Sequence, residues 1–167
     1  MADVTIFMGS ASDEEKVASC MEILQKLGIS FAVTVTSAHR TAERTAQLVR
    51  EEEASGCKVF ICAAGMAAHL AGAVAARTIK PVLGIPISGQ ALAGMDALLS
   101  TVQMPPGYPV ATLALDKAGA RNAAWLAAEI LALGNSALAE IIREARSVMQ
   151  SDVEEQGRRI SAQYASQ

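Results

Sequence analysis

The sequence predicts a three-layer α/β fold, in which a parallel sheet lies between two layers of helices. Short apolar runs alternate with helical patterns along residues 1–135. The runs are apolar at nearly every position, as strands are when helices cover both faces of a sheet. Hydrophobic residues make up 51% of the 167 residues and charged residues only 19%, which excludes intrinsic disorder as the main state.

The first half of the chain is predicted to form three strands and two helices. An apolar run at residues 4–8, which Gly9 closes, is the first strand. The capping and acidic residues at 12–15 then begin a helix whose apolar residues recur at helical spacing as far as Gly28. The next elements are a β-branched strand, a helix and an apolar strand, at residues 31–35, 41–55 and 58–63.

The second half continues the alternation. A helix of small residues at 67–78 cannot continue past Pro81. It is followed by a strand, a helix, a strand and a helix, at residues 82–87, 91–101, 110–115 and 119–133. Parallel strands joined by right-handed crossovers leave few arrangements, and we predict the flavodoxin-like strand order 2-1-3-4-5.

The C-terminal segment departs from this pattern. Residues 136 to about 161 predict one long helix of mixed charge with an apolar stripe. Because a five-stranded core already has its helices, this one needs another surface. It either folds back on its own domain or, as we favour, packs on a neighbouring subunit. We therefore expect an α/β domain at residues 1–135, which carries the functional site, and a helical extension at 136–167.

Charge and composition exclude several classes of partner. The net charge is −3, aromatic residues reach only 4%, and no basic stripe is visible, which argues against nucleic acid. No apolar run approaches the roughly 18–20 residues of a membrane span. The first residues lack the basic start of a signal peptide, and three cysteines without metal-ligand spacing favour a reducing compartment. We expect a cytoplasmic protein without membrane or nucleic-acid partners.

Three polar, glycine-bearing loops follow the first three predicted strands. They lie at residues 9–13, 37–40 and 64–69, and they hold both histidines of the chain. In the order 2-1-3-4-5 the strand order reverses between strands one and three. Ligands of open parallel sheets bind beyond the carboxyl ends of the strands at that reversal, so the loops should share one site.

The first loop suits a phosphorylated ligand. Ser10 and Ser12 offer hydroxyls, and the helix start behind them offers free backbone N–H groups. An ordinary capped turn explains these residues equally well, and the spacing matches neither the Walker loop nor the dinucleotide fingerprint. Asp13 either complements the helix dipole or accepts hydrogen bonds from ribose hydroxyls.

The second and third loops supply a cation and two imidazoles. Arg40 is a fixed cation suited to a phosphate, and the neighbouring His39 is able to move a proton at neutral pH. A lone loop histidine is often incidental, but the adjacent arginine favours a functional interpretation. In the third loop, small residues allow close approach of a flat ligand, and His69 with the helix start could bind a carboxylate. Tight packing explains the alanines there but not the histidine.

The loops together predict a site for a small anionic, phosphorylated compound, with a histidine as the acid–base. We expect no metal and no bound coenzyme, because two histidines without cysteines or paired carboxylates make a poor ligand set. A receiver domain would need acidic residues where the chain has Gly9-Ser10 and Ala64-Gly65. A flavin module would need aromatic residues in the loops. A non-enzymatic module that binds a phosphorylated ligand remains an alternative.

Six stretches between Val4 and Leu133 carry a resemblance to a known family. They are residues 8–13, 37–41, 65–72, 84–86, 102–105 and 117–124. By these stretches the chain resembles the PurE family of purine biosynthesis, class I, whose members are N5-carboxyaminoimidazole ribonucleotide mutases. The resemblance implies a cofactor-independent isomerase that assembles as an octamer. It also implies transfer of a carboxylate from the exocyclic nitrogen of an aminoimidazole ribonucleotide to ring carbon C4.

The resemblance assigns roles to the loop residues. It implies that His39 is the catalytic acid–base and that Arg40 binds the ribonucleotide. It also implies that the third loop lines the pocket for the carboxylate or carbon dioxide. The predicted catalytic residues are His39 and His69, and the predicted substrate-binding residues are Ser10, Ser12, Asp13, Ser37, Arg40, Gly65, Ala67 and Leu70.

A second branch of the family is a rival, because it takes free carbon dioxide and aminoimidazole ribonucleotide directly. Its third loop typically carries Ser and Asn where this chain has residues 67–69, Ala-Ala-His, so the mutase is favoured. The chain departs from the family pattern at three places. Met66 stands where glycine is frequent, Gly89-Gln90 replaces a Ser-Lys or Ser-Ala pair, and Asp116 stands where glycine is usual. The first two are expected near the pocket.

Overall fold

A computed structural model describes residues 1–165 and divides the chain into two compact units, Met1–Ala128 and a second that begins at Glu129. The first unit is an alternation of strands and helices. Its elements are β1 (Val4–Met8), the 3-10 turn η1 (Ala11–Asp13), α1 (Glu14–Lys26), β2 (Phe31–Val35), α2 (Ala42–Ala54), β3 (Val59–Gly65), α3 (Leu70–Ala75), β4 (Val82–Ile87), α4 (Met95–Val102), β5 (Ala111–Thr112) and most of α5 (Asp116–Ala132), whose last residues, from Glu129, belong to the second unit.

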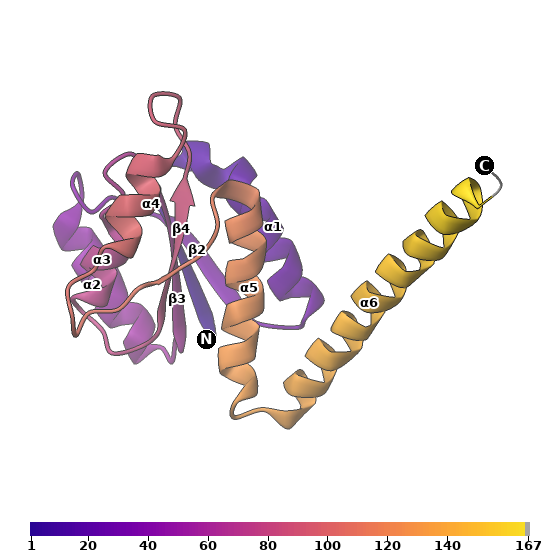
Figure 1. Ribbon diagram of the computed structural model, residues 1–167. Helices are drawn as coiled ribbons and strands as arrows, with labels where there is room; N and C mark the ends of the chain where they lie inside the picture. Colours follow the sequence, from indigo (N-terminus) through magenta and orange to yellow (C-terminus); the bar gives the residue numbers. More distant parts are fainter. Residues whose placement is uncertain (166–167) are drawn as a thin grey trace. The chain divides into compact units, whose positions relative to one another are not determined.

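The five strands form one parallel sheet in the order β2-β1-β3-β4-β5, which confirms the predicted topology. Figure 1 shows α1 and α5 on one face of the sheet and α2, α3 and α4 on the other. Met8 lies opposite Val35 of β2 and Ala63 of β3, so the carboxyl ends of these strands meet at one edge. The loops that follow them therefore start close together.

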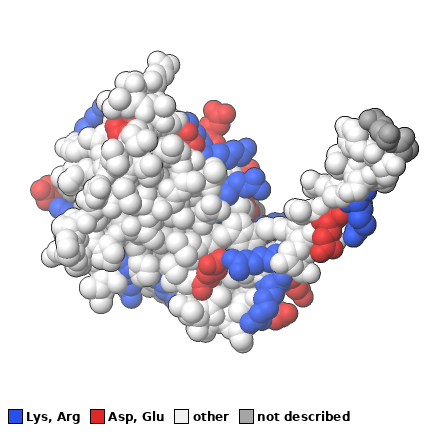
Figure 2. Space-filling view, viewed as in Figure 1, with Lys and Arg blue, Asp and Glu red and all other residues white. Residues whose placement is uncertain are grey.

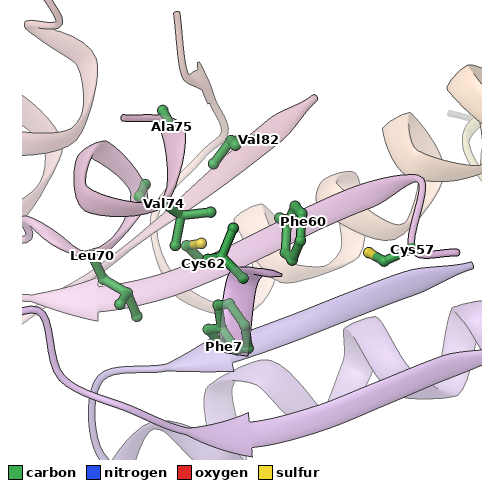
Figure 3. Packing of buried hydrophobic residues seen from close by; sticks show 10 residues of the cluster. Phe7, Cys57, Phe60, Cys62, Leu70, Val74, Ala75 and Val82 are labelled. Carbon is green, nitrogen blue, oxygen red and sulfur yellow. The ribbon is translucent and has the colours of Figure 1, made fainter. Parts of the chain in front are cut away.

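Apolar side chains from the sheet and from α3 form the core between these layers. Figure 3 shows Phe7 and Phe60 on neighbouring strands of the sheet, with Leu70 and Val74 reaching the sheet from α3. The two phenyl centroids lie 5.8 Å apart. Complete burial of one such side chain contributes about 1.5–3 kcal/mol to folding. The core thus fixes α3, and with it the loop that precedes α3.

All three cysteines are free and buried, and they pack as small hydrophobic residues. Burial raises the pKa of Cys20 to about 12. Burial also raises the pKa of Cys57 and Cys62. The three thiols are therefore protonated at neutral pH and serve as packing groups.

The structure shortens two of the predicted helices. α3 begins at Leu70 instead of residue 67 and has six residues. Met66 adopts a φ of +57°, which no right-handed helix tolerates, so residues 66–69 form a loop. Likewise α4 begins at Met95 instead of residue 91, because Ala93 and Gly94 have φ of +49° and +87°. At the far edge, β5 keeps only Ala111–Thr112 of its predicted six residues.

The second unit contains α6 (Ser136–Tyr164), a helix of 29 residues. The Asn135 side chain caps it by accepting a hydrogen bond from the Leu138 N–H at 3.1 Å. Leu138 and Ile142 are buried, while the apolar side chains farther along the helix are exposed. This confirms the predicted long helix, and the roles expected of residues 1–135 and 136–167 stay predictions. Within residues 1–165, no helix combines the length and apolar character needed to cross a membrane.

Candidate active site

A cavity of about 480 Å³ opens at the carboxyl ends of the strands, where the strand order reverses between β1 and β3. Four segments line it, one after each of β1 to β4. The lining residues are Gly9, Ser10, Ser12, Asp13, Ser37, Ala38, His39, Arg40, Ala64, Gly65, Met66, Ala67, His69, Leu70, Ile87, Ser88 and Gly89. Every predicted catalytic and substrate-binding residue lies on this cavity, although their roles stay predictions.

The first segment is a capped turn that still faces the cavity. The Ser10 hydroxyl oxygen accepts hydrogen bonds from the Ser12 N–H at 3.2 Å and from the Ser12 hydroxyl at 2.8 Å. The simple capping interpretation of these serines is therefore correct locally. Both side chains are nevertheless exposed at the cavity wall, where a ligand anion could replace their mutual contact.

Asp13 is buried in the same segment, just before α1. It is the N-cap residue of α1, but its carboxylate makes no capping bond to that helix. Burial raises the pKa of Asp13, and contacts with the Ser12 hydroxyl and the Ser10 backbone oppose only part of that effect. A buried carboxylate with spare acceptor capacity suits a ligand that donates hydroxyl groups, such as a ribose.

The second segment is a tight turn that exposes two side chains. The Ser37 hydroxyl accepts a hydrogen bond from the Arg40 N–H at 3.2 Å, and the Thr41 hydroxyl oxygen accepts one from the Ser37 N–H at 2.9 Å. These bonds fix the backbone and leave the His39 and Arg40 side chains exposed. Ser37 thus has a structural role in the turn, in addition to its place on the cavity.

The third segment bends sharply because of its first two residues. A Cβ on Gly65 would lie 2.9 Å from the Ile87 carbonyl oxygen, closer than real Cβ contacts allow. The positive φ of Met66 then turns the chain, and the His69 N–H donates to the Ala67 carbonyl at 2.7 Å. This turn carries His69 over the cavity. Met66 itself is exposed at the rim.

The two histidines meet across the cavity. The ring centroids of His39 and His69 lie 5.6 Å apart, with the rings tilted by 50°. They come from separate loops, so only the fold brings them together. Two imidazoles at this distance can contact the same small group, one as a proton carrier and the other as a hydrogen-bond partner.

The fourth segment was not among the predicted site residues. Ile87 ends β4, Ser88 and Gly89 follow it, and only the departure at Gly89-Gln90 pointed toward them. Gly89 lines the cavity as expected of that departure, as does Met66. The general signal was available, because every strand of a parallel sheet ends at this edge. Among residues 1–165, no three His, Cys, Asp or Glu side chains are placed to hold a metal ion.

Comparison with known proteins adds a family. The sequence model of AIR carboxylase matches residues 3–152. A protein of Brucella melitensis named N5-carboxyaminoimidazole ribonucleotide mutase is 50% identical over 153 residues, which cover 92% of this chain and 94% of that protein. A protein of the same name in Escherichia coli strain K12 is 46% identical, over 91% of this chain and 90% of that protein. Another in Pyrococcus horikoshii is 44% identical, over 94% of this chain and 88% of that protein.

Solved structures agree with the sequence comparison. The crystal structures of Treponema denticola PurE and of a substituted form of PurE from the same organism each superpose with a TM-score of 0.83. Each is 30% identical and covers 93% of this chain and 96% of that chain. Fold and sequence agree along almost the whole chain, and the protein therefore belongs to the AIR carboxylase family, PurE.

Proposed function

We propose that this protein converts N5-carboxyaminoimidazole ribonucleotide to 4-carboxy-5-aminoimidazole ribonucleotide in purine biosynthesis, as a cofactor-independent isomerase. One observation carries the proposal: His39, His69, Arg40 and the buried carboxylate of Asp13 converge on one cavity. The relatives of that name, 44% to 50% identical, support the choice of substrate.

The ribonucleotide is bound by the first two segments. Arg40 and the hydroxyls of Ser10 and Ser12 bind the phosphate, because a guanidinium with nearby hydroxyls offers charge-assisted donors. Asp13 accepts hydrogen bonds from the ribose hydroxyls. The base then lies toward the third segment, between the imidazoles of His39 and His69.

The migrating carboxylate is held by the third segment. Gly65, Ala67 and Leu70 offer small or apolar surface, which excludes water from a carbon dioxide molecule. His69 donates a hydrogen bond to the carboxylate oxygens. Holding carbon dioxide beside the ring replaces a bimolecular encounter by an intramolecular one.

The reaction balances with His39 as both acid and base. The bond between the exocyclic nitrogen and the carboxylate carbon breaks, and the electron pair returns to nitrogen, which takes a proton from protonated His39. Ring carbon C4 then forms a bond to the released carbon dioxide. His39 finally removes the C4 proton, which restores aromaticity and returns the histidine to its starting state. Such positioned proton transfer contributes about 10²–10⁴ in rate.

The test offers two substrates to purified protein. One assay supplies N5-carboxyaminoimidazole ribonucleotide in ¹³C-labelled bicarbonate, and the other supplies aminoimidazole ribonucleotide in the same buffer. A mutase converts the first substrate, keeps the carboxylate unlabelled, and makes little use of the second. Product formed only from the second substrate, with label incorporated, would overturn the proposal in favour of a carboxylase.

That carboxylase is the second candidate, because the matching family model is described as AIR carboxylase. Met66 and Gly89 also line the cavity, and both depart from the mutase pattern. Efficient use of free carbon dioxide would make these two positions the ones to exchange. Turnover of neither substrate would leave a module that binds a phosphorylated ligand.

We further propose that the protein is a homo-oligomer, for which the family resemblance implies an octamer. Support comes from α4, whose Met95, Leu99 and Val102 side chains are exposed at helical spacing. Figure 2 shows few charged side chains on the face of the first unit that carries this helix. Exposed apolar side chains on α6, including Val148 and Val153, support a role for the extension in the same assembly.

The assembly is tested by the mass in solution of the full chain and of two variants. We expect an octamer for the full chain and smaller species for Leu99→Asp and for deletion of residues 136–167. A monomeric full chain would contradict the proposal.

The free thiols of all three cysteines support a reducing compartment, and we propose the cytoplasm, which cell fractionation tests.

A further inference from the structure

Ser88, on the cavity wall after β4, is held by two charged side chains that lie behind the wall. The carboxylate of Asp116 accepts hydrogen bonds from the Ser88 N–H, at 2.8 Å, and from the Ser88 hydroxyl. The Lys16 ammonium donates to the Ser88 carbonyl at 2.9 Å and to the Ser88 hydroxyl oxygen at 3.0 Å. Every polar group of Ser88 is therefore bonded to one of these two residues.

The two charged residues also bind each other. Lys16 Nζ lies 2.9 Å from Asp116 Oδ1, so all three N–H donors of the ammonium are engaged. Partial burial alone would raise the pKa of Asp116, but hydrogen bonds from Ser88 and Lys16 outweigh it and lower the pKa. The aspartate is thus ionised at neutral pH, and the contact is a charged one. It joins α1, the start of α5 and the segment after β4.

The backbone at Asp116 indicates that its side chain serves a purpose. Asp116 has a φ of +54°, a conformation that is strained for residues other than glycine. A glycine would relieve that strain, yet it could not bind Ser88 or Lys16. The strain persists because the carboxylate is held in place by three donors from two elements.

The anchored residue also controls the rest of the connection between β4 and α4. Figure 1 shows this connection projecting beyond the end of β4. At its far end Gly94 returns against Ser88, and a Cβ on Gly94 would lie 3.0 Å from the Ser88 Cβ. Ser88 is therefore the fixed point for both ends of the projecting segment, and Gly89, which lines the cavity, follows it directly.

We propose that Lys16 and Asp116 are positioning residues, which act through Ser88 to hold the β4 wall of the cavity in place for the ribonucleotide. The inference rests on the proposed function, since the wall matters to a substrate only if the cavity binds one. Neither residue lines the cavity. The wall contacts the substrate before and during the reaction alike, so its loss should raise KM and leave kcat nearly unchanged.

Two substitutions at Asp116 separate positioning from stability. Asp116→Gly removes both hydrogen bonds between Asp116 and Ser88 but relieves the strained φ. We therefore expect an unlowered Tm and a KM raised about tenfold. Asp116→Asn tolerates the same φ and keeps an acceptor for the Ser88 N–H, so its KM should rise less. A merely structural residue would instead lower Tm or leave KM unchanged.

Lysine variants supply the matched control. Lys16→Met removes one ion pair that touches the wall, and Lys58→Met removes another, to Asp3 at 2.8 Å, outside the lining of the cavity. We expect a higher KM for the first variant only. The double variant of Lys16→Met with Asp116→Gly should raise KM by less than the product of the two single effects, because both residues act through Ser88. Additive effects would overturn the proposal.

Amide hydrogen exchange gives a readout that needs no activity. We expect faster exchange over residues 88–94 in Asp116→Gly than in the unaltered protein, with residues 4–8 of β1 unchanged. If the unaltered protein turns over neither substrate, the proposed function fails, and the exchange experiment still decides whether Lys16 and Asp116 hold the wall. Unchanged exchange at 88–94 together with unchanged KM would overturn the positioning role.

Discussion

The two sides of the cavity are built differently. On the histidine side, residues 37–40 and 65–69, backbone bonds fix the turns, while the imidazoles of His39 and His69 make none of the hydrogen bonds found among residues 1–165. On the β4 side, residues 87–89, every polar group of Ser88 is bonded to Lys16 or Asp116. The imidazoles that we propose to bind or react are thus free of hydrogen bonds within residues 1–165, while the β4 wall is held by charged ones.

The largest expected effect comes from removing the proposed proton carrier, His39, on the histidine side. His39→Asn should lower kcat by about 10²–10⁴, because a positioned acid–base contributes that much, and should leave substrate affinity nearly unchanged. Single-turnover kinetics and equilibrium binding measure the two quantities. His69→Asn is the matched control at the second imidazole. Unlike His39→Asn, it should raise KM in addition to any change in kcat. Near-normal turnover in His39→Asn would remove the mechanism proposed for this side.

A smaller loss is expected at the neighbouring cation. Arg40→Ala should weaken substrate binding by roughly 10- to 100-fold, since a hydrogen bond to a charged group contributes about 1.5–3 kcal/mol. Arg40→Lys keeps the charge without the fork and should recover part of the affinity. Calorimetric titration of both variants checks this. Affinity unchanged by Arg40→Ala would exclude Arg40 from phosphate binding.

The junction of the two sides is at Gly65, whose backbone touches Ile87. Gly65→Ala places a Cβ 2.9 Å from the Ile87 carbonyl oxygen. That oxygen belongs to the backbone of the paired strand β4, so it cannot move away easily. We expect a loss of about 1–3 kcal/mol in the free energy of unfolding, as for other overpacked sites. Urea denaturation measures it. The adjacent Met66→Gly is the control, and should be neutral or stabilising because it relieves a positive φ.

The smallest effect concerns pH and Asp13. Because burial raises the pKa of this carboxyl above its ordinary 3.8, the folded state holds the proton more tightly than the unfolded chain. Its contribution to stability therefore falls as pH rises from about 3.8 through the raised pKa, and at neutral pH the charge opposes folding. Asp13→Asn should raise the Tm at pH 7, and this gain should shrink as the pH is lowered toward 3.8. A lower Tm at pH 7 would contradict this sign.

Much of the fold could be predicted because its signals are local. The apolar runs of β1, β2 and β4 have the predicted bounds, and right-handed crossovers leave few strand orders. The predicted start of α3 was wrong because Met66 adopts a positive φ without the glycine or asparagine that marks such turns. The predicted start of α4 was wrong because Ala93 does the same, although Gly94 beside it marks the turn. A sequence gives no other sign of a strained residue.

One part of the candidate site could be predicted from the sequence and another part could not. The three loops were predicted to meet because the rule for parallel sheets needs only the strand order. The wall after β4 was missed because Ser88 and Gly89 carry no histidine or charge of their own. Its anchors come from α1 and α5, with Lys16 and Asp116 a hundred positions apart, and no local pattern links them. The roles of the loop residues stay predictions.

The three buried thiols can report which part of the protein unfolds first. Cys20 lies in α1, whereas Cys57 precedes β3 and Cys62 lies within it, so the first thiol reports on a helical layer and the other two on the sheet. A protonated, enclosed thiol does not react with an alkylating reagent until its surroundings part. Mass spectrometry at rising urea concentration would show the order in which the three cysteines are alkylated. That order would rank the helical layer and the sheet by their stability toward opening, without any introduced probe.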